Sequence, residues 1–109
     1  MPNPPRQPIR LVRCPAEPAV AMIGGKWKIP ILWHLFEGPK RFSELQRGLA
    51  PITQKVLIQQ LRDLEADALV TRTVYAEVPP RVDYALTPRG RSLKPIILSL
   101  CHWSKSCPK

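Results

Sequence analysis

The fold is decided by residues 53–86, TQKVLIQQLRDLEADALVTRTVYAEVPPRVDYAL, where a helical pattern gives way to two short β patterns. Thr53 is a suitable N-cap for a helix that runs to about Asp67, since leucines recur through it at helical spacing. Alternating, β-branched residues follow over 70–75 and again over 81–86, with two prolines in the connection between them. The stretch therefore predicts a long helix followed by a β-hairpin.

Upstream of this stretch the sequence predicts three shorter helices. The first ends at Ile23 before a Gly-Gly pair, the second spans about 27–36, and the third is short with Ser43 as its N-cap. After the hairpin, Thr87 caps a final helix that Pro95 must bend or restart. The predicted class is mainly α with a small antiparallel β-hairpin (α+β), in the order of a winged helix-turn-helix.

The chain of 109 residues suits one domain. Residues 1–13 hold four prolines and are expected to form a flexible N-terminal arm, and residues 14–109 to form the folded domain. The sequence shows no apolar run of membrane-spanning length and no signal-peptide pattern, so a cytoplasmic protein without membrane contact is expected.

The charge balance indicates a polyanionic partner. Seventeen Lys and Arg against eight Asp and Glu give a net charge of +9, and each phosphate that a cation neutralises releases counterions. Double-stranded DNA is the expected partner. A basic surface that is merely solvated, an RNA-binding module and a protein-interaction winged helix without operator specificity remain alternatives.

The long helix predicts its own DNA-reading face. Leu57, Leu61 and Leu64 form a core stripe, so the other side of the helix faces outward. Gln can pair with adenine, Arg with guanine, and Ile can contact a thymine methyl, whereas an ordinary solvated helix face is the alternative. The residues expected to contact bases are Gln54, Ile58, Gln59 and Arg62.

The hairpin predicts a wing. Arg81 follows two prolines at the expected tip, where a stiff loop would present its cation to the minor groove or to a phosphate, with Arg72 in support. Alternatively, the prolines only shape the turn and block edge pairing. The residues expected at phosphates or in the wing are Lys26, Ser43, Thr53, Lys55, Arg72 and Arg81.

Several motifs together resemble the HxlR-type bacterial transcriptional regulators, a MarR-like family. The resemblance covers roughly residues 14–104, in order, and rests on Cys14-Pro15, IGGKWK at 23–28, RFSEL at 41–45, QQLRDLE at 59–65, PPRVDY at 79–84 and LTPRG at 86–90. It implies a winged helix-turn-helix homodimer that binds a palindromic operator and often regulates a neighbouring gene. A repressor is the expected role, and activation is the alternative that the sequence leaves open.

The resemblance also implies a dimer interface made by the first and last helices, residues 15–25 and 90–106. The apolar stripe of the last helix could equally cover the core of the monomer. The residues expected at the interface are Val20, Ile23, Leu93, Ile97, Leu100 and Trp103.

Cys14 is the candidate switch among three cysteines. Arg10 and Arg13 lie close to it in the sequence, and a nearby cation is typical of reactive thiols. Cys14 also matches a cysteine that senses electrophiles or oxidants in some members of the family, so an oxidant or small-molecule effector is expected. A small residue at a helix entry is the alternative, and no role is predicted for Cys101 and Cys107.

Enzyme chemistry is not expected. Neither His34 nor His102 is placed near Cys14, and no phosphate-binding glycine loop is present. The spacing of Cys101, His102 and Cys107 matches no usual zinc pattern, so neither a cofactor nor a metal is expected.

Overall fold

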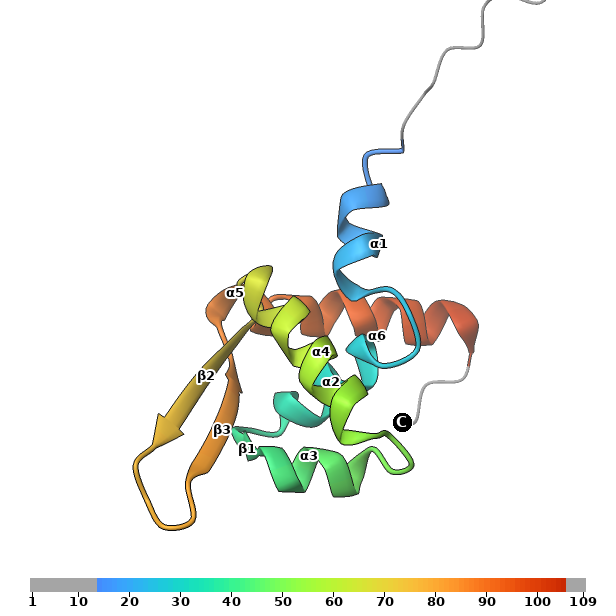
Figure 1. Cartoon of the computed structure of the whole chain (residues 1–109). Helices are drawn as coiled ribbons and strands as arrows, with labels where there is room; N and C mark the ends of the chain where they lie inside the picture. The colour runs from blue at the N-terminus through green and yellow to red at the C-terminus, as the bar shows by residue number, and fades with distance from the viewer. Residues whose placement is uncertain (1–13, 106–109) are drawn as a thin grey trace, which may run out of the picture.

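The computed structural model describes residues 14–105 (Figure 1). The expected arm at 1–13 and the last four residues of the expected domain lie outside the described residues. The helices are α1 (Glu17–Ile23), α2 (Lys28–Phe36), α3 (Phe42–Gly48), α4 (Gln54–Ala66), α5 (Pro88–Arg91) and α6 (Leu93–Ser104), and the strands are β1 (Lys40–Arg41), β2 (Val70–Tyr75) and β3 (Arg81–Leu86).

The sheet is antiparallel, with strand order β1-β3-β2. The two predicted strands of the hairpin are confirmed, and they pair from Val70 opposite Leu86 to Tyr75 opposite Arg81. The sequence did not predict β1, because a two-residue strand is too short to show any alternation. It pairs with β3 through Arg41 opposite Asp83, so the central strand of the sheet is β3.

The core lies where the helices meet the sheet. The predicted stripe of α4 is confirmed, since Leu57, Leu61 and Leu64 are each at most 1% exposed. These leucines pack with buried apolar residues of α2 and the sheet. The burial of this stripe orients α4 and turns the other side of the helix toward solvent.

Helix α3 begins earlier than predicted. Ser43 is not the N-cap, since the helix starts at Phe42 and Arg41 occupies the cap position. The backbone amide of Arg41 donates to Glu44 Oε1 at 3.0 Å, which closes one half of a capping box. The pairing of β1 holds Arg41 in an extended conformation, so the helix can begin at the very next residue.

The predicted restart of the last helix is confirmed. The Thr87 hydroxyl accepts from the Gly90 amide at 2.9 Å and donates to the Ala68 carbonyl at 2.7 Å, which fixes the start of α5. A Cβ at Gly90 would overlap the Leu69 carbonyl, so only glycine allows this close approach. A new helix, α6, then starts at Leu93, with Pro95 in its first turn, where a missing amide costs little.

Helices α1 and α6 lie on the side of the molecule away from the wing. Figure 1 shows α1 extending from the body above α6, and no residue of α1 is buried. Across residues 14–105, no helix is long and apolar enough to cross a membrane.

Candidate functional site

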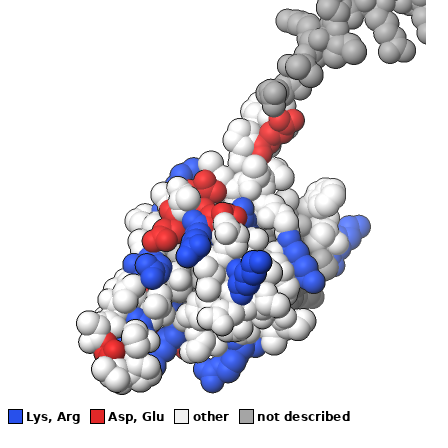
Figure 2. Space-filling view, in the orientation of Figure 1, with Lys and Arg blue, Asp and Glu red and all other residues white. Residues whose placement is uncertain are grey.

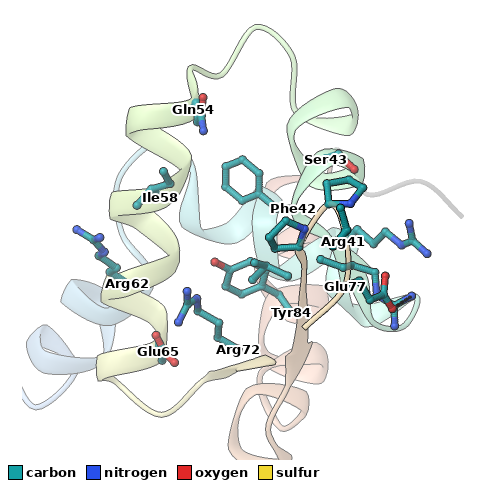
Figure 3. Close-up of a pocket in the computed structure, with 15 residues that line it drawn as sticks. Arg41, Phe42, Ser43, Gln54, Ile58, Arg62, Glu65, Arg72, Glu77 and Tyr84 are labelled. Atoms are coloured by element: carbon teal, nitrogen blue, oxygen red, sulfur yellow. Dashed lines mark ion pairs between the residues drawn. The ribbon is translucent and has the colours of Figure 1, made fainter. Parts of the chain in front are cut away.

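A cavity of about 660 Å³ lies between α4 and the β2–β3 hairpin, which we call the wing. Figure 3 shows α4 forming one wall and the start of α3 together with the wing forming the other. Fifteen residues line this cavity: Arg41, Phe42, Ser43, Gln54, Ile58, Arg62, Glu65, Arg72, Glu77, Val78, Pro79, Pro80, Arg81, Val82 and Tyr84. The lining holds four arginines and two glutamates, so the concave face carries an excess of positive charge.

Three of the four residues expected to contact bases line this cavity from α4. Gln54 and Arg62 are exposed and Ile58 is half-buried, so all three reach the surface of the wall. Their positions follow from the N-cap, where the Thr53 hydroxyl accepts from the Val56 amide at 3.2 Å. Thr53, expected at a phosphate, therefore also fixes where α4 begins.

The outer face of α4 carries the remaining candidates of this helix. Lys55 and Gln59 lie there with Thr53 and Arg62 on a shallow, open surface. The Gln59 side-chain amide donates to Asp63 Oδ1 at 3.0 Å, and Lys28 Nζ lies 3.8 Å from Asp63 Oδ2. Gln59 is therefore held in one orientation with its amide oxygen left to accept, while Lys55 projects into solvent.

The floor of the cavity pairs a cation with a phenol. Arg72 on β2 lies opposite Tyr84 on β3 and points toward α4 (Figure 3). Burial of the ring raises the pKa of the Tyr84 phenol above its ordinary value of 10, and the guanidinium of Arg72 partly opposes that rise. The phenol therefore stays neutral at physiological pH and serves Arg72 as a hydrogen-bonding support.

Arg81 is not the free cation that we expected at the wing tip. It is the first residue of β3, and its side chain lies between Glu77 and Asp83, at 3.7 Å and 3.4 Å, and over the ring of Tyr75. The connecting residues 76–80 extend beyond it. The sequence suggested a position at the tip because Arg81 directly follows two prolines. It does not show that the β2–β3 ladder extends as far as Arg81.

Of the other residues expected at phosphates, Ser43 lines the cavity and Lys26 does not. Ser43 lies at the cavity beside Phe42, while Lys26 lies in the turn before α2, with its ammonium 4.9 Å from the Trp27 ring centroid, and does not line the cavity. The sequence did not point to Arg41 or Tyr84 as members of the site. Pairing of β1 with β3 brings them there, and only the RFSEL and PPRVDY motifs could have hinted at it.

Charge is unevenly distributed along α4. Figure 2 shows acidic side chains gathered near its C-terminal end and basic ones over much of the same view. The sequence agrees, since residues 53–62 contain no carboxylate whereas Asp63, Glu65 and Asp67 follow directly. The N-terminal half of α4 is therefore the part suited to approach a polyanion.

The second notable surface is apolar and lies on α1 and α6. Val20, Leu100 and Trp103 are 59%, 47% and 83% exposed, although all three are large hydrophobic residues. Ile96 is exposed beside them, while Ile23 and Leu93 are half-buried. Ile97 differs, because it is only 5% exposed and belongs to the core of the monomer.

The two cysteines within residues 14–105 differ in their exposure to solvent. Cys14 is exposed just before α1, and Cys101 is half-buried on α6. Arg10, Arg13 and Cys107, which the sequence placed in the same discussion, lie outside the described residues.

Helices α3 and α4, the short turn between them and the wing after them define a winged helix-turn-helix protein. A family model described as the HxlR-like helix-turn-helix matches residues 22–109. The chain therefore belongs to the HxlR-like helix-turn-helix family, which confirms the resemblance seen in the sequence.

Curated relatives agree with this assignment. Two proteins of Bacillus subtilis (strain 168), each described as an uncharacterized HTH-type transcriptional regulator, are similar to the chain over most of its length. YybR is 50% identical over 85% of this chain and 74% of its own length, and YkvN is 54% identical over 83% and 76%. Fold and relatives together make the chain a transcriptional regulator of the helix-turn-helix type.

Solved structures with the same fold include a redox regulator. The redox regulator HypR in its reduced form has a TM-score of 0.80 and 48% identity, covering 85% of this chain and 92% of that chain. The reduced form of the transcriptional regulator YodB from B. subtilis has a TM-score of 0.77 and 35% identity, covering 86% and 93%.

Proposed function

We propose that the chain binds a palindromic operator in double-stranded DNA as a homodimer and represses transcription from it. In this proposal α4 enters the major groove and the wing lies along the neighbouring minor groove. The observation that carries it is the arginine-lined cavity between α4 and the wing, with Gln54, Ile58 and Arg62 on its α4 wall.

In this proposal some side chains of α4 contact bases and others contact phosphates. Arg62 suits a guanine edge, Gln54 and Gln59 suit adenine, and Ile58 suits a thymine methyl. Lys55 and Thr53 lie where phosphates would flank the helix, so they set position without reading sequence. An RNA-binding role is less well supported, because single-stranded RNA is bound mainly by aromatic platforms and Arg62, Arg72 and Arg41 dominate this surface.

A second copy of the chain is the proposed cover for the apolar surface of α1 and α6. Val20, Ile96, Leu100 and Trp103 expose large apolar side chains on neighbouring elements, and burying them removes apolar area from water. Ile23 and Leu93 would lie at its edge, and Ile97 would support it from the core. A two-fold dimer then matches a palindromic operator.

The test is binding of the purified protein to the intergenic DNA upstream of its own gene, against random duplex of equal length and across a salt series. The expected result is a selective complex with two protomers per site. Equal binding to both duplexes, falling steeply with salt, would contradict an operator in this intergenic DNA and indicate a non-specific binder or a target elsewhere in the genome.

We further propose that Cys14 makes DNA binding responsive to oxidants or electrophiles. Its exposure supports this, as does the likeness to HypR, which is described as a redox regulator. A quinone or another Michael acceptor would form a carbon–sulfur bond at Sγ as its carbon–carbon double bond opens, and the thiol proton would pass through solvent to the adduct. Treatment with such a reagent should change operator affinity in the wild type and leave Cys14→Ser unchanged, whereas an equal response in both proteins would contradict the switch.

A further inference from the structure

The guanidinium of Arg81 is surrounded by partners from every part of the wing. Its Cζ lies 4.1 Å from the ring centroid of Tyr75, the residue directly opposite it in the ladder. Its Nη1 lies 3.7 Å from Glu77 Oε1 in the connection, and its Nε lies 3.4 Å from Asp83 Oδ1 on the same strand. We call these four residues, Tyr75, Glu77, Arg81 and Asp83, the Arg81 clamp.

The innermost contact of the clamp is shielded from solvent. Arg81 Nε and Asp83 Oδ1 are both buried, and within residues 14–105 neither makes a hydrogen bond, so each compensates mainly the charge of the other. Withdrawing the guanidinium would leave a buried carboxylate oxygen uncompensated, which is costly. The clamp therefore holds Arg81 in place.

The positive charge of Arg81 is already neutralised by carboxylates, which disfavours its binding to a phosphate. One guanidinium faces two carboxylates, those of Glu77 and Asp83, and Arg41 is the cation at the register position opposite Asp83. A phosphate approaching Arg81 would meet Glu77 as well, which is half exposed at the rim. Arg72 faces a neutral phenol on β3 and offers a cation to the cavity, with Glu65 on the α4 wall across from it.

Beyond the clamp the wing ends in an apolar tip. Val78 is fully exposed and two prolines follow it, while Glu77, the only charged residue of the connection 76–80, lies within reach of Arg81. Apolar side chains and prolines contact the minor groove of DNA in proteins that read its shape. This tip borders the same cavity as the α4 wall.

We propose that Arg81 is a positioning residue that fixes the wing, and that the wing meets the minor groove through the apolar tip at Val78 and Pro79. This inference rests on the proposed DNA-binding function. It assigns to Arg81 a role through Tyr75 and Glu77 instead of a direct contact with phosphate.

The experiment measures operator affinity across a salt series for Arg81→Gln, Arg81→Lys, Glu77→Gln and Val78→Ser. A positioning role predicts that both Arg81 variants weaken binding roughly tenfold with an unchanged salt slope, since a lysine cannot stack on a ring and span two carboxylates. Val78→Ser should also weaken binding at every salt concentration. Arg72→Gln is the positive control, with a slope reduced by about 1, and Glu37→Gln, just after α2 and outside both proposed surfaces, is the neutral one.

Glu77→Gln gives the sharpest contrast. If Arg81 contacted phosphate, removing a neighbouring negative charge would strengthen binding, whereas loss of the clamp should weaken it by up to about fivefold. Glu77 is exposed, so this variant is expected to fold even if the Arg81 variants do not.

Three results would overturn the inference. They are a slope reduced by about 1 in Arg81→Gln with near wild-type binding by Arg81→Lys, tighter binding by Glu77→Gln, and wild-type affinity of Val78→Ser. These outcomes leave the proposed function intact. Failure of the wild-type protein to bind any duplex would instead overturn the proposed function, and the role of the wing tip with it.

Discussion

The α4–wing surface and the α1–α6 surface differ in the kind of side chain that they expose to solvent. The first exposes arginines around a cavity, with Arg62 and Arg72 as prominent members. The second exposes large apolar side chains, with Leu100 and Trp103 as prominent members. Exposed cations fit a polyanion and exposed hydrophobic residues fit another protein surface, so the two surfaces suit two different partners.

The comparison also shows how one core serves both surfaces. Leu61 fixes the orientation of α4, and Ile97 fixes that of α6, and both belong to the same buried cluster. Changes on the α4–wing surface should therefore weaken DNA binding and leave the dimer intact, whereas changes on the α1–α6 surface should break the dimer and weaken DNA binding only through that loss. Four predictions test this separation, from the largest expected effect to the smallest.

Charging the apolar surface should have the largest effect. The double variant Leu100→Glu with Trp103→Glu places two carboxylates on a face that the dimer would bury, so the protein should become a monomer. Operator affinity should fall by roughly a hundredfold or more, because the second half-site contact is no longer intramolecular. Light scattering gives the mass. Glu37→Lys, at an exposed position just after α2 and outside both surfaces, is the control and should remain dimeric, and a dimeric double variant would contradict the assigned interface.

Removing one cation from α4 should come next. Arg62→Ala should cost about 1–3 kcal/mol of operator binding and relax the base preference at one position in each half-site. Binding to a set of single-base operator variants measures this, and the mass should stay that of the dimer. A uniform loss across all operator variants would show that Arg62 contacts phosphate instead of a base.

A smaller effect is expected at the outer face of α4. Lys55→Gln should weaken binding to operator and random duplex alike, with a salt slope reduced by about 1, because a phosphate contact carries no sequence information. The measurement is the same salt series. Unequal losses on the two duplexes would indicate that Lys55 also reads sequence.

The smallest effect is expected at the N-cap of α4. Thr53→Ala removes the acceptor of the Val56 amide and should lower the free energy of unfolding by about 1 kcal/mol, whereas Thr53→Asn keeps a capping oxygen. Urea denaturation measures the stability. If Thr53→Asn also lost stability, the hydroxyl would have a role other than capping.

Local patterns predicted most of the fold. The stripe of Leu57 and Leu61, the Thr53 cap and the bounds of both long strands follow from residues close together in the sequence, and the structure agrees. β1 and the start of α3 did not follow, because pairing of Arg41 with the distant Asp83 decides both.

The site divides in the same way. The outward face of α4 could be predicted from helical spacing, since burial of one stripe turns Gln54 and Arg62 to the surface. The state of Arg81 could not, because its charge is compensated by Glu77 in the connection and by Asp83 two residues along β3. The sequence shows only that residue 81 is a cation, whereas the folded wing shows that this cation is paired with carboxylates.

Helix α1 adds a consequence for the behaviour of the protein at low concentration. It has seven residues and none is buried, and only Met22 and Ile23 at its end pack against the core, so the helix is marginally stable in water without a further partner. Its formation would then be coupled to subunit association, so helical content should rise with protein concentration. Below the dissociation constant of the dimer, α1 would then unfold as the subunits separate. Occupancy of the operator would therefore fall more steeply than the concentration of the protein.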